Sequence, residues 1–252
     1  MRPSSRGVAL LSQGGGEEGE LDDSRRRPAL VLLEGNIGAG KTTLGKRLAD
    51  SGRYTFLEEP VRSWKQGFED DLLSLFYGEP KRWAFSFQLA AFTTRLMQWQ
   101  EALREPARLP LVLERSVYCD RHVFARNCYE QGLMTQTEWQ LYCRLWDWVC
   151  PRQFAETSTI VYVRTPVESC RERILRRGRA EETGIAPAYL SALERLHDDW
   201  LLSTPGVAVL DGTLEWSPDA VDEKLREAAE ARSGGQVLDR LERAPAQTAV
   251  PA

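Results

Sequence analysis

The sequence lacks several features that would place it in other classes of protein. No apolar run approaches the roughly 20 residues needed to span a bilayer, which argues against a membrane protein. Basic residues are not in excess: 33 lysines and arginines face 37 acids, so the net charge is −4, unlike the basic field of most nucleic-acid binders. The five cysteines form no C-x-x-C pair, and the two histidines stand at no ligand-like spacing from them. We therefore expect no zinc site and a reduced, intracellular protein.

The remaining composition suits one soluble α/β domain with a sizeable core, since 42% of the 252 residues are hydrophobic. Residues 1–28 combine a glycine run, an acidic patch and three consecutive arginines without apolar periodicity, which predicts a disordered leader. Residues 233–252 are typical of a flexible tail. We expect a cytoplasmic protein, and the arginines and serines of the first thirteen residues make a mitochondrial location the alternative.

Short apolar runs rich in Val, Leu and Ile alternate with longer helical patterns along residues 29–232. Strands buried on both faces have this composition, and their alternation with helices predicts an α/β fold with a parallel sheet covered on both sides. Two helix starts carry Thr-x-x-Glu capping signals, at Thr135 and Thr165. The expected strands lie at 29–34, 54–58, 110–114, 159–164 and 207–211.

The stretch GNIGAGKT at residues 35–42 matches the phosphate-binding pattern G-x-x-x-x-G-K-[ST]. It follows an expected strand and opens an expected helix, which is the context that the motif requires. The glycines let backbone N–H groups curl around phosphate oxygens, and the helix N-terminus adds a favourable dipole. We expect Lys41 to reach the β- and γ-phosphates of a nucleoside triphosphate and Thr42 to ligate Mg²⁺.

Charged residues follow the second and third expected strands. In an open α/β sheet, ligands bind beyond the carboxyl ends of the strands, so these residues should face the γ-phosphate. Phosphoryl transfer to a hydroxyl needs a carboxylate that orients and deprotonates the hydroxyl, together with cations for the phosphate oxygens. Glu59 or Glu58 is the candidate base. Arg115 is a candidate cation, and Glu114 should lie near the metal.

Four motifs occur in a characteristic order: EGNIGAGKTT, EEPVRSW, ERSVYCDRHVFARN and RRGRAEETGI. Over roughly residues 29–230 the chain resembles the deoxynucleoside kinase family of animals and viruses. The resemblance implies a five-stranded parallel sheet wrapped by helices, a homodimer, and transfer of the γ-phosphate of ATP or another nucleoside triphosphate to the 5′-hydroxyl of a deoxynucleoside. It identifies Glu59 as the general base, Arg115 as the catalytic arginine, and Glu114 as the acid linked to Mg²⁺.

The same resemblance assigns roles to the arginine-rich stretch that ends at Gly178, where a helix should break. Arg177 and Arg179 would be cations of a lid that closes over the donor phosphates and excludes water. Glu182 would bind the sugar 3′-hydroxyl together with Tyr77. The donor would be contacted by the divergent loop at 211–216, by Arg173, and by the phosphate-loop residues Gly35, Asn36, Ile37, Gly38, Ala39, Gly40, Lys41, Thr42 and Thr43.

The acceptor base should be read from a long helix expected at 81–105. Gln88 and Arg95 stand seven residues apart on one face of it, and a Gln side chain can both donate to and accept from a base edge. By resemblance, Gln88 reads the base, and Arg95 and Asp120 match the Arg–Asp pair of the deoxycytidine and deoxyguanosine kinases. An Asp accepts from an amino group such as that of cytosine, whereas thymine would leave it poorly paired. The pocket would be lined by Trp64, Phe87 and Phe124.

One departure complicates the choice of substrate. The segment between Trp64 and Tyr77 is short, as in thymidine-type members, whereas Arg95 and Asp120 match the other branch. We give the specificity residues precedence, and the expected order of substrates is deoxycytidine, then purine deoxynucleosides, then thymidine. Two other interpretations remain open. A nucleoside monophosphate kinase such as thymidylate kinase would need a cationic site for the acceptor's phosphate, and a non-catalytic nucleotide-binding module would need a metal-holding Asp and a water-positioning residue. Intact Lys41, Glu59 and Arg115 favour catalysis.

Overall fold

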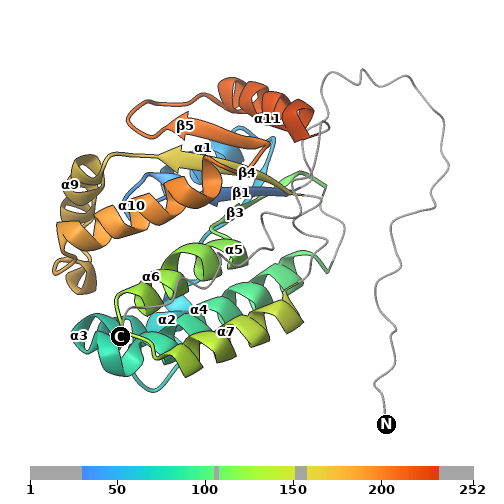
Figure 1. Cartoon of the computed structure of the whole chain (residues 1–252). Coiled ribbons are helices and arrows are strands. Elements are labelled where there is room, and N and C mark those ends of the chain that lie inside the picture. Colours follow the sequence, from blue (N-terminus) through green and yellow to red (C-terminus); the bar gives the residue numbers. More distant parts are fainter. Residues whose placement is uncertain (1–29, 105–107, 151–157, 233–252) are drawn as a thin grey trace, which may run out of the picture.

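The computed structural model describes residues 30–104, 108–150 and 158–232, so the predicted leader and tail lie outside the described residues. A five-stranded, all-parallel sheet with the order β2-β3-β1-β4-β5 runs through the centre (Figure 1). The predicted strands all form, and each boundary lies within one residue of its expected place. They are β1 (Leu30–Glu34), β2 (Thr55–Leu57), β3 (Leu111–Glu114), β4 (Ser158–Arg164) and β5 (Val207–Asp211).

Helices cover both faces of the sheet, which explains why the strands are apolar on both sides. In β1, Leu30 and Leu32 pack into one core, together with side chains of α4 (Pro80–Ala102), α7 (Gln136–Val149) and α10 (Pro187–Leu201). Val31 and Leu33 point the other way, into a second core with side chains of α1 (Lys41–Asp50) and α11 (Pro218–Arg232). The α/β fold expected from the sequence is confirmed.

The remaining elements connect the strands around the site. The helix expected at 81–105 is α4, which starts at Pro80 and ends three residues earlier than predicted. Within the described residues, no helix is both long enough and apolar enough to span a membrane. The other elements are α2 (Val61–Gln66), α3 (Leu72–Gly78), α5 (Val117–Cys119), a π-helical turn η2 (Asp120–Ala125), α6 (Arg126–Glu130), α9 (Val167–Arg177) and a 3₁₀ turn η3 (Ala180–Glu182).

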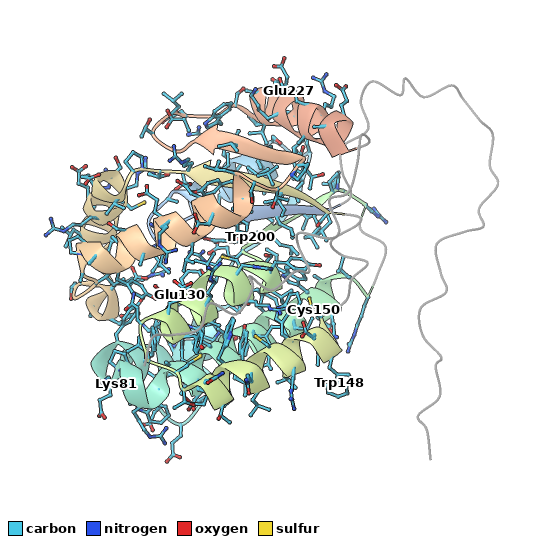
Figure 2. All side chains as sticks on the ribbon, viewed as in Figure 1. Lys81, Glu130, Trp148, Cys150, Trp200 and Glu227 are labelled. Carbon is cyan, nitrogen blue, oxygen red and sulfur yellow. The ribbon has the colours of Figure 1, made fainter. Side chains whose placement is uncertain are left out.

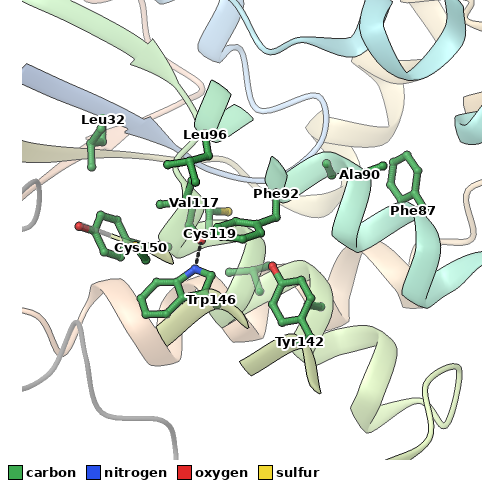
Figure 3. Packing of buried hydrophobic residues seen from close by; sticks show 14 of the residues in the cluster. Leu32, Phe87, Ala90, Phe92, Leu96, Val117, Cys119, Tyr142, Trp146 and Cys150 are labelled. Carbon is green, nitrogen blue, oxygen red and sulfur yellow. Dashed lines mark hydrogen bonds between the residues drawn. The ribbon is translucent and has the colours of Figure 1, made fainter. Parts of the chain in front are cut away.

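Packing in the larger core fixes the segment that carries Asp120. Trp146 of α7 donates its Nε1–H to the carbonyl oxygen of Val117 over 2.8 Å (Figure 3). Phe92 of α4 meets Tyr142 of α7 edge to face, with ring centroids 6.0 Å apart, and both are buried. The start of α5 is therefore held by side chains from two long helices, so the turn that follows it has a defined position.

The two predicted capping signals have different outcomes. Thr135 forms a complete capping box: its hydroxyl accepts from the backbone N–H of Glu138, and the Glu138 carboxylate accepts from the backbone N–H of Thr135. The prediction for Thr165 is wrong, because α9 begins after Pro166 without a side-chain cap. The Thr165 hydroxyl instead donates to the carbonyl oxygen of Ala39 over 3.0 Å. It thereby ties the end of β4 to the phosphate loop.

Candidate active site

The phosphate loop is held in shape by its own backbone and by a buried lysine. Gly38 and Gly40 adopt positive φ angles of 77° and 101°, a region that glycine enters without steric cost. Lys41 is buried, and its Nζ donates to the carbonyl oxygens of Gly35 at 3.1 Å and Asn36 at 2.9 Å. Burial, together with the nearby Arg115 guanidinium, lowers the pKa of Lys41 to about 8.

The two candidate bases point in different directions. Glu59 lies between two arginines, with Oε1 at 2.8 Å from Arg95 Nη2 and 3.0 Å from Arg115 Nε. Burial alone would raise the pKa of Glu59, but the positive charges of Arg115, Arg95 and Lys41 outweigh it and lower the pKa to about 2. Glu58 is half exposed and pairs with Lys46 at 2.7 Å. The geometry therefore favours Glu59 over Glu58 as the carboxylate of the site.

Behind Glu59, the Arg95 guanidinium joins three elements of the fold. Its Nε donates to Asp120 Oδ2 at 2.9 Å, and its Nη1 donates to the backbone carbonyl of Glu114 at 3.2 Å. Arg95 and Asp120 are only 1% and 2% exposed, so the pair expected from the sequence exists and is desolvated. Burial raises the pKa of Asp120 despite its partner, whereas the neighbouring carboxylates raise the pKa of Arg95 despite burial.

Arg115 is placed by an unusual backbone turn at the end of β3. Among the described residues it is the one non-glycine with a positive φ, at 67°. The turn sends its Nη1 to the carbonyl oxygen of Gly35 at 2.9 Å and sets the guanidinium over the Phe124 ring, 4.5 Å from its centroid. A costly conformation of this kind persists where surrounding contacts over-determine it, as they do here.

The predicted metal ligands lie together. The Thr42 hydroxyl donates to both oxygens of the Glu114 carboxylate, at 2.8 and 3.0 Å. A hydroxyl and a carboxylate beside the phosphate loop are hard oxygen ligands of the type that Mg²⁺ binds, usually together with substrate phosphates and water. The residues present therefore fit the ion that the sequence suggested.

Two cavities meet at Lys41, which lines both. The first, of about 420 Å³, is lined by Glu59, Arg95 and Asp120 together with apolar side chains of α2, α3 and α4. The second, of about 710 Å³, lies along the phosphate loop, α9 and the loop at 212–216. Both cavities have the size of a small-molecule site. They share the lining residues Gly38, Lys41, Thr42, Glu58, Glu114, Arg177 and Arg179, so ligands in the two would meet at the phosphate loop.

Comparison with known proteins agrees with this arrangement. The model of the deoxynucleoside kinase family matches residues 31–230. The chain belongs to the deoxynucleoside kinase family. It is 36% identical over 194 residues to mouse deoxycytidine kinase, covering 68% of this chain and 75% of that protein. It is 37% identical over 210 residues to chicken deoxycytidine kinase 2 (74% and 79%), and 30% identical over 200 residues to the mitochondrial thymidine kinase 2 of Macaca fascicularis (79% and 73%).

The chain is therefore a nucleoside kinase, a phosphotransferase, as its four motifs suggested. The residues expected to form a lid make a small network of their own. Gly178 ends α9 with a φ of 69°, as predicted. Arg177 Nη2 and Arg179 Nη1 both donate to the buried Glu182 carboxylate, the second over 3.0 Å. Tyr77 lines the same cavity as Glu182, and burial together with the charge of Glu182 raises the pKa of Tyr77.

The residues that the sequence suggested for reading the base line the first cavity. Gln88 is 1% exposed, and its Nε2 donates to Cys128 Sγ over 3.7 Å. Trp64 is anchored by a 2.8 Å bond from its Nε1 to the Thr94 hydroxyl and packs edge to face on Phe87. Phe124 completes the wall.

The second cavity contains the predicted donor contacts. Arg173 donates to the carbonyl oxygens of Ala39 at 2.9 Å and Gly212 at 2.8 Å. It therefore links the phosphate loop to the loop at 211–216. Arg121, which follows Asp120, forms an ion pair with Asp147 at 2.7 Å and stacks on Trp146.

Sequence reasoning missed a buried cluster behind Arg115. Glu34, Cys119 and His197 come within 4.8 Å of one another, although histidine–cysteine spacing gave no sign of it. Arg115 Nη1 lies 3.6 Å from Cys119 Sγ, and this cation disfavours a metal ion. Burial raises the pKa of the Glu34 carboxyl to about 7, although Ser116, Cys119 and the charge of Arg115 act in the opposite direction. The available signal in the sequence was the position of Glu34, an acid at the end of an apolar strand and directly before Gly35 of the phosphate loop.

Proposed function

We propose that this kinase transfers the γ-phosphate of ATP, or of another nucleoside triphosphate, to the 5′-hydroxyl of a deoxynucleoside in nucleotide salvage. The observation that carries the proposal is the position of Glu59. Its carboxylate lies in the first cavity, is held by two arginines, and is close enough to Lys41 for that charge to lower its pKa. A carboxylate there can orient the acceptor hydroxyl toward a phosphate bound at the loop.

Cations for the transferred group come from several sides. Lys41, Arg177 and Arg179 line both cavities, and Arg115 lines the first. In the proposed reaction they stabilise the negative charge on the equatorial phosphate oxygens, and Glu59 accepts the proton of the 5′-hydroxyl. Mg²⁺, held by Thr42 and Glu114, would supply further positive charge to the donor phosphates.

We propose deoxycytidine as the preferred acceptor, then purine deoxynucleosides, then thymidine. Asp120 uses Oδ2 for Arg95, which leaves Oδ1 for a donor on the ligand such as the amino group of cytosine. Gln88, buried at the wall of the same cavity, supplies a second polar contact to the base edge. Two relatives named as deoxycytidine kinases, at 36% and 37% identity, support this order over the thymidine kinase at 30%.

We also propose a homodimer that forms through the outer side of α4 and α7. Large apolar side chains are exposed there: Met97 by 67%, Leu141 by 53% and Trp148 by 82%. Figure 2 shows Trp148 at the end of α7. Exposed apolar groups gathered on neighbouring helices are typical of an interface. Sedimentation of the wild type and of Trp148→Glu tests this: the wild type should be a dimer, and a monomeric wild type would contradict the proposal.

All five cysteines are free, which supports the proposal of a reducing compartment. We propose the cytoplasm, with the mitochondrion as the alternative. Localisation of the full chain in cells, compared with a chain that starts at residue 29, decides between the two. Entry of only the longer chain into mitochondria would contradict a cytoplasmic assignment.

An acceptor screen with radiolabelled ATP and Mg²⁺ tests the reaction itself. We expect phosphorylation of deoxycytidine above deoxyguanosine and deoxyadenosine, with thymidine lowest. Phosphorylation of dCMP or dTMP with the free nucleosides inert would overturn the proposed acceptor class. Replacing ATP with UTP, GTP and CTP in the same assay establishes the donor, and replacing Mg²⁺ with EDTA tests the metal.

A further inference from the structure

One ion pair joins the lid segment (residues 178–186, between α9 and α10) to the opposite wall of the first cavity. Lys65 Nζ lies 2.7 Å from Glu181 Oε1. Lys65 belongs to α2 and follows Trp64, which lines the cavity. Glu181 belongs to η3 and precedes Glu182. The pair therefore links a wall of the cavity to the turn that carries the proposed 3′-hydroxyl ligand.

The turn η3 also packs against α3, but among the described residues no second ion pair joins the lid segment to α2. The arginine bonds of the lid segment, from Arg177 and Arg179 to Glu182, are local, so they shape the segment without attaching it to α2. The segment contains Gly178, with a φ of 69°, and Gly184, and glycine allows a wider range of backbone conformations than other residues. Within the described residues, Lys65–Glu181 is the ion pair that spans the gap between the lid segment and α2.

Burial makes the two partners unequal. The Glu181 side chain is 6% exposed, whereas that of Lys65 is 36% exposed. A carboxylate hidden from water is costly unless a cation compensates it, so loss of Lys65 would drive Glu181, and η3 with it, toward solvent. Loss of the Glu181 charge would remove the attraction without creating this penalty. Replacement of Lys65 should therefore open the lid segment more than replacement of Glu181.

We propose that Lys65 and Glu181 are positioning residues, whose ion pair holds η3 against α2 so that Glu182 and the two lid arginines close over a bound deoxynucleoside. This role rests on the proposed function, because closure matters to catalysis only if the first cavity binds the acceptor. Neither residue takes part in the chemistry. Their pair sets the fraction of molecules in which the lid is closed, and closure excludes water from the transferring phosphate.

The test compares Lys65→Met, Glu181→Gln and the double variant with the wild type. Lys224→Met, which breaks the remote Lys224–Glu227 pair on α11, is the matched control. Limited trypsin digestion of the ligand-free protein reports lid opening through fragments cut after Arg177 and Arg179. We expect Lys65→Met to speed these cuts roughly tenfold and Glu181→Gln about threefold, since cleavage follows the open population. The double variant should be cleaved more slowly than Lys65→Met, because it no longer contains the unpaired Glu181 carboxylate.

Kinetics supply a readout that a purely structural role would not change. Lys65→Met should raise the KM for deoxycytidine by roughly the same factor as it raises the rate of lid cleavage, and it should increase acceptor-independent ATP hydrolysis. Its melting temperature should equal that of Lys224→Met. Unchanged lid cleavage together with unchanged KM in Lys65→Met would overturn the proposal. A wild type that phosphorylates no deoxynucleoside would refute the proposed function instead, and trypsin cleavage would still decide whether the pair holds the lid.

Discussion

The two cavities are built by different physical means. The first, proposed to bind the deoxynucleoside, is called the acceptor half here, and the second, proposed to bind the nucleoside triphosphate, the donor half. In the acceptor half, charged side chains compensate one another: Arg95 pairs with Asp120 and Glu59, and Arg115 also pairs with Glu59. In the donor half, Arg173 bonds to backbone carbonyls, those of Ala39 and Gly212, and the charge pairs Lys46–Glu58 and Arg47–Glu215 lie at its more exposed side. Lys41 likewise donates to carbonyl oxygens of its own loop.

This difference separates two ways of preparing a site for its ligand. A closed set of buried ion pairs fixes side-chain positions before the ligand arrives, which suits selection of one base by its hydrogen-bonding edge. Cations held only by neutral carbonyls can exchange those partners for phosphate, a stronger and charged acceptor. The acceptor half should therefore be sensitive to loss of any one charge. Loss of one charge from the donor half should have a smaller effect on activity.

The strongest test of the comparison is Glu59→Gln, which removes the carboxylate at the centre of the acceptor half. We expect kcat to fall by roughly 10²- to 10⁴-fold, because the hydroxyl loses the group that orients and deprotonates it. Nucleotide affinity, measured by calorimetry, should stay within a factor of about three, since no donor contact is lost. Turnover near that of the wild type would remove Glu59 as the base.

The Arg95–Asp120 pair provides the next test. Arg95→Met leaves Asp120 buried without its partner, so the free energy of unfolding in urea should fall by about 3–5 kcal/mol. Adding Asp120→Ala removes the orphaned charge, so the double variant should be more stable than the single and should accept thymidine better relative to deoxycytidine.

The exposed pair Lys224–Glu227 serves as the control for that experiment. Its loss in Lys224→Met should cost less than about 1 kcal/mol of unfolding free energy. Equal losses for Arg95→Met and Lys224→Met would refute the view that buried charge pairing organises the acceptor half. An unchanged acceptor profile in the double variant would show that the base is read elsewhere.

The sequence predicted the fold and the phosphate loop because both depend on local patterns. Apolar runs of the right length predicted all five strands, and the spacing of Gly35, Gly40 and Lys41 predicted the phosphate loop. Long-range pairing was harder. Arg95 and Asp120 could be paired only by resemblance to known kinases, since 25 residues and a strand separate them. Periodicity carries no information on such contacts.

Other features could not be predicted because they depend on competition between partners in three dimensions. Thr165 has a capping sequence, but a phosphate-loop carbonyl lies within reach and takes its hydroxyl. Glu34 becomes a buried acid only because α5 and α10 close over the end of β1. Lys65 and Glu181 carried no signal of pairing, since 116 residues separate them in the chain and they meet only where α2 and η3 come together.

Arg173→Met probes the donor half. The replacement removes two bonds to carbonyl oxygens and should loosen the phosphate loop from the loop at 211–216. We expect the KM for ATP to rise roughly tenfold, as for the loss of a charge-assisted hydrogen bond, with little change in the KM for deoxycytidine. Arg171→Met, on the exposed side of the same helix, is the control. A comparable rise in both KM values would mean that the two halves are not built independently.

The smallest effect should appear in the pH dependence between pH 5 and 8.5, where the donor half should respond and the acceptor half should not. The lowered pKa of Lys41, about 8, means that the free enzyme loses this charge as pH rises through 8, well below the ordinary value of 10.5. The kcat/KM for ATP should therefore fall about twofold at pH 8 and about fourfold at pH 8.5 relative to pH 7, since kcat/KM reports the free enzyme.

The kcat at saturating ATP should change less over this range, because bound phosphates raise the pKa of Lys41 again. Glu59, with a pKa lowered to about 2, is ionised throughout, so kcat/KM for deoxycytidine at saturating ATP should be level between pH 5 and 8. The pH profile of kcat/KM for ATP in Lys41→Arg shows whether Lys41 is the titrating group. An arginine stays charged, so the fall in kcat/KM above pH 8 should vanish. A break near pH 7 in the deoxycytidine profile would instead indicate Glu34, and would show that the acceptor half depends on a titrating group behind Arg115.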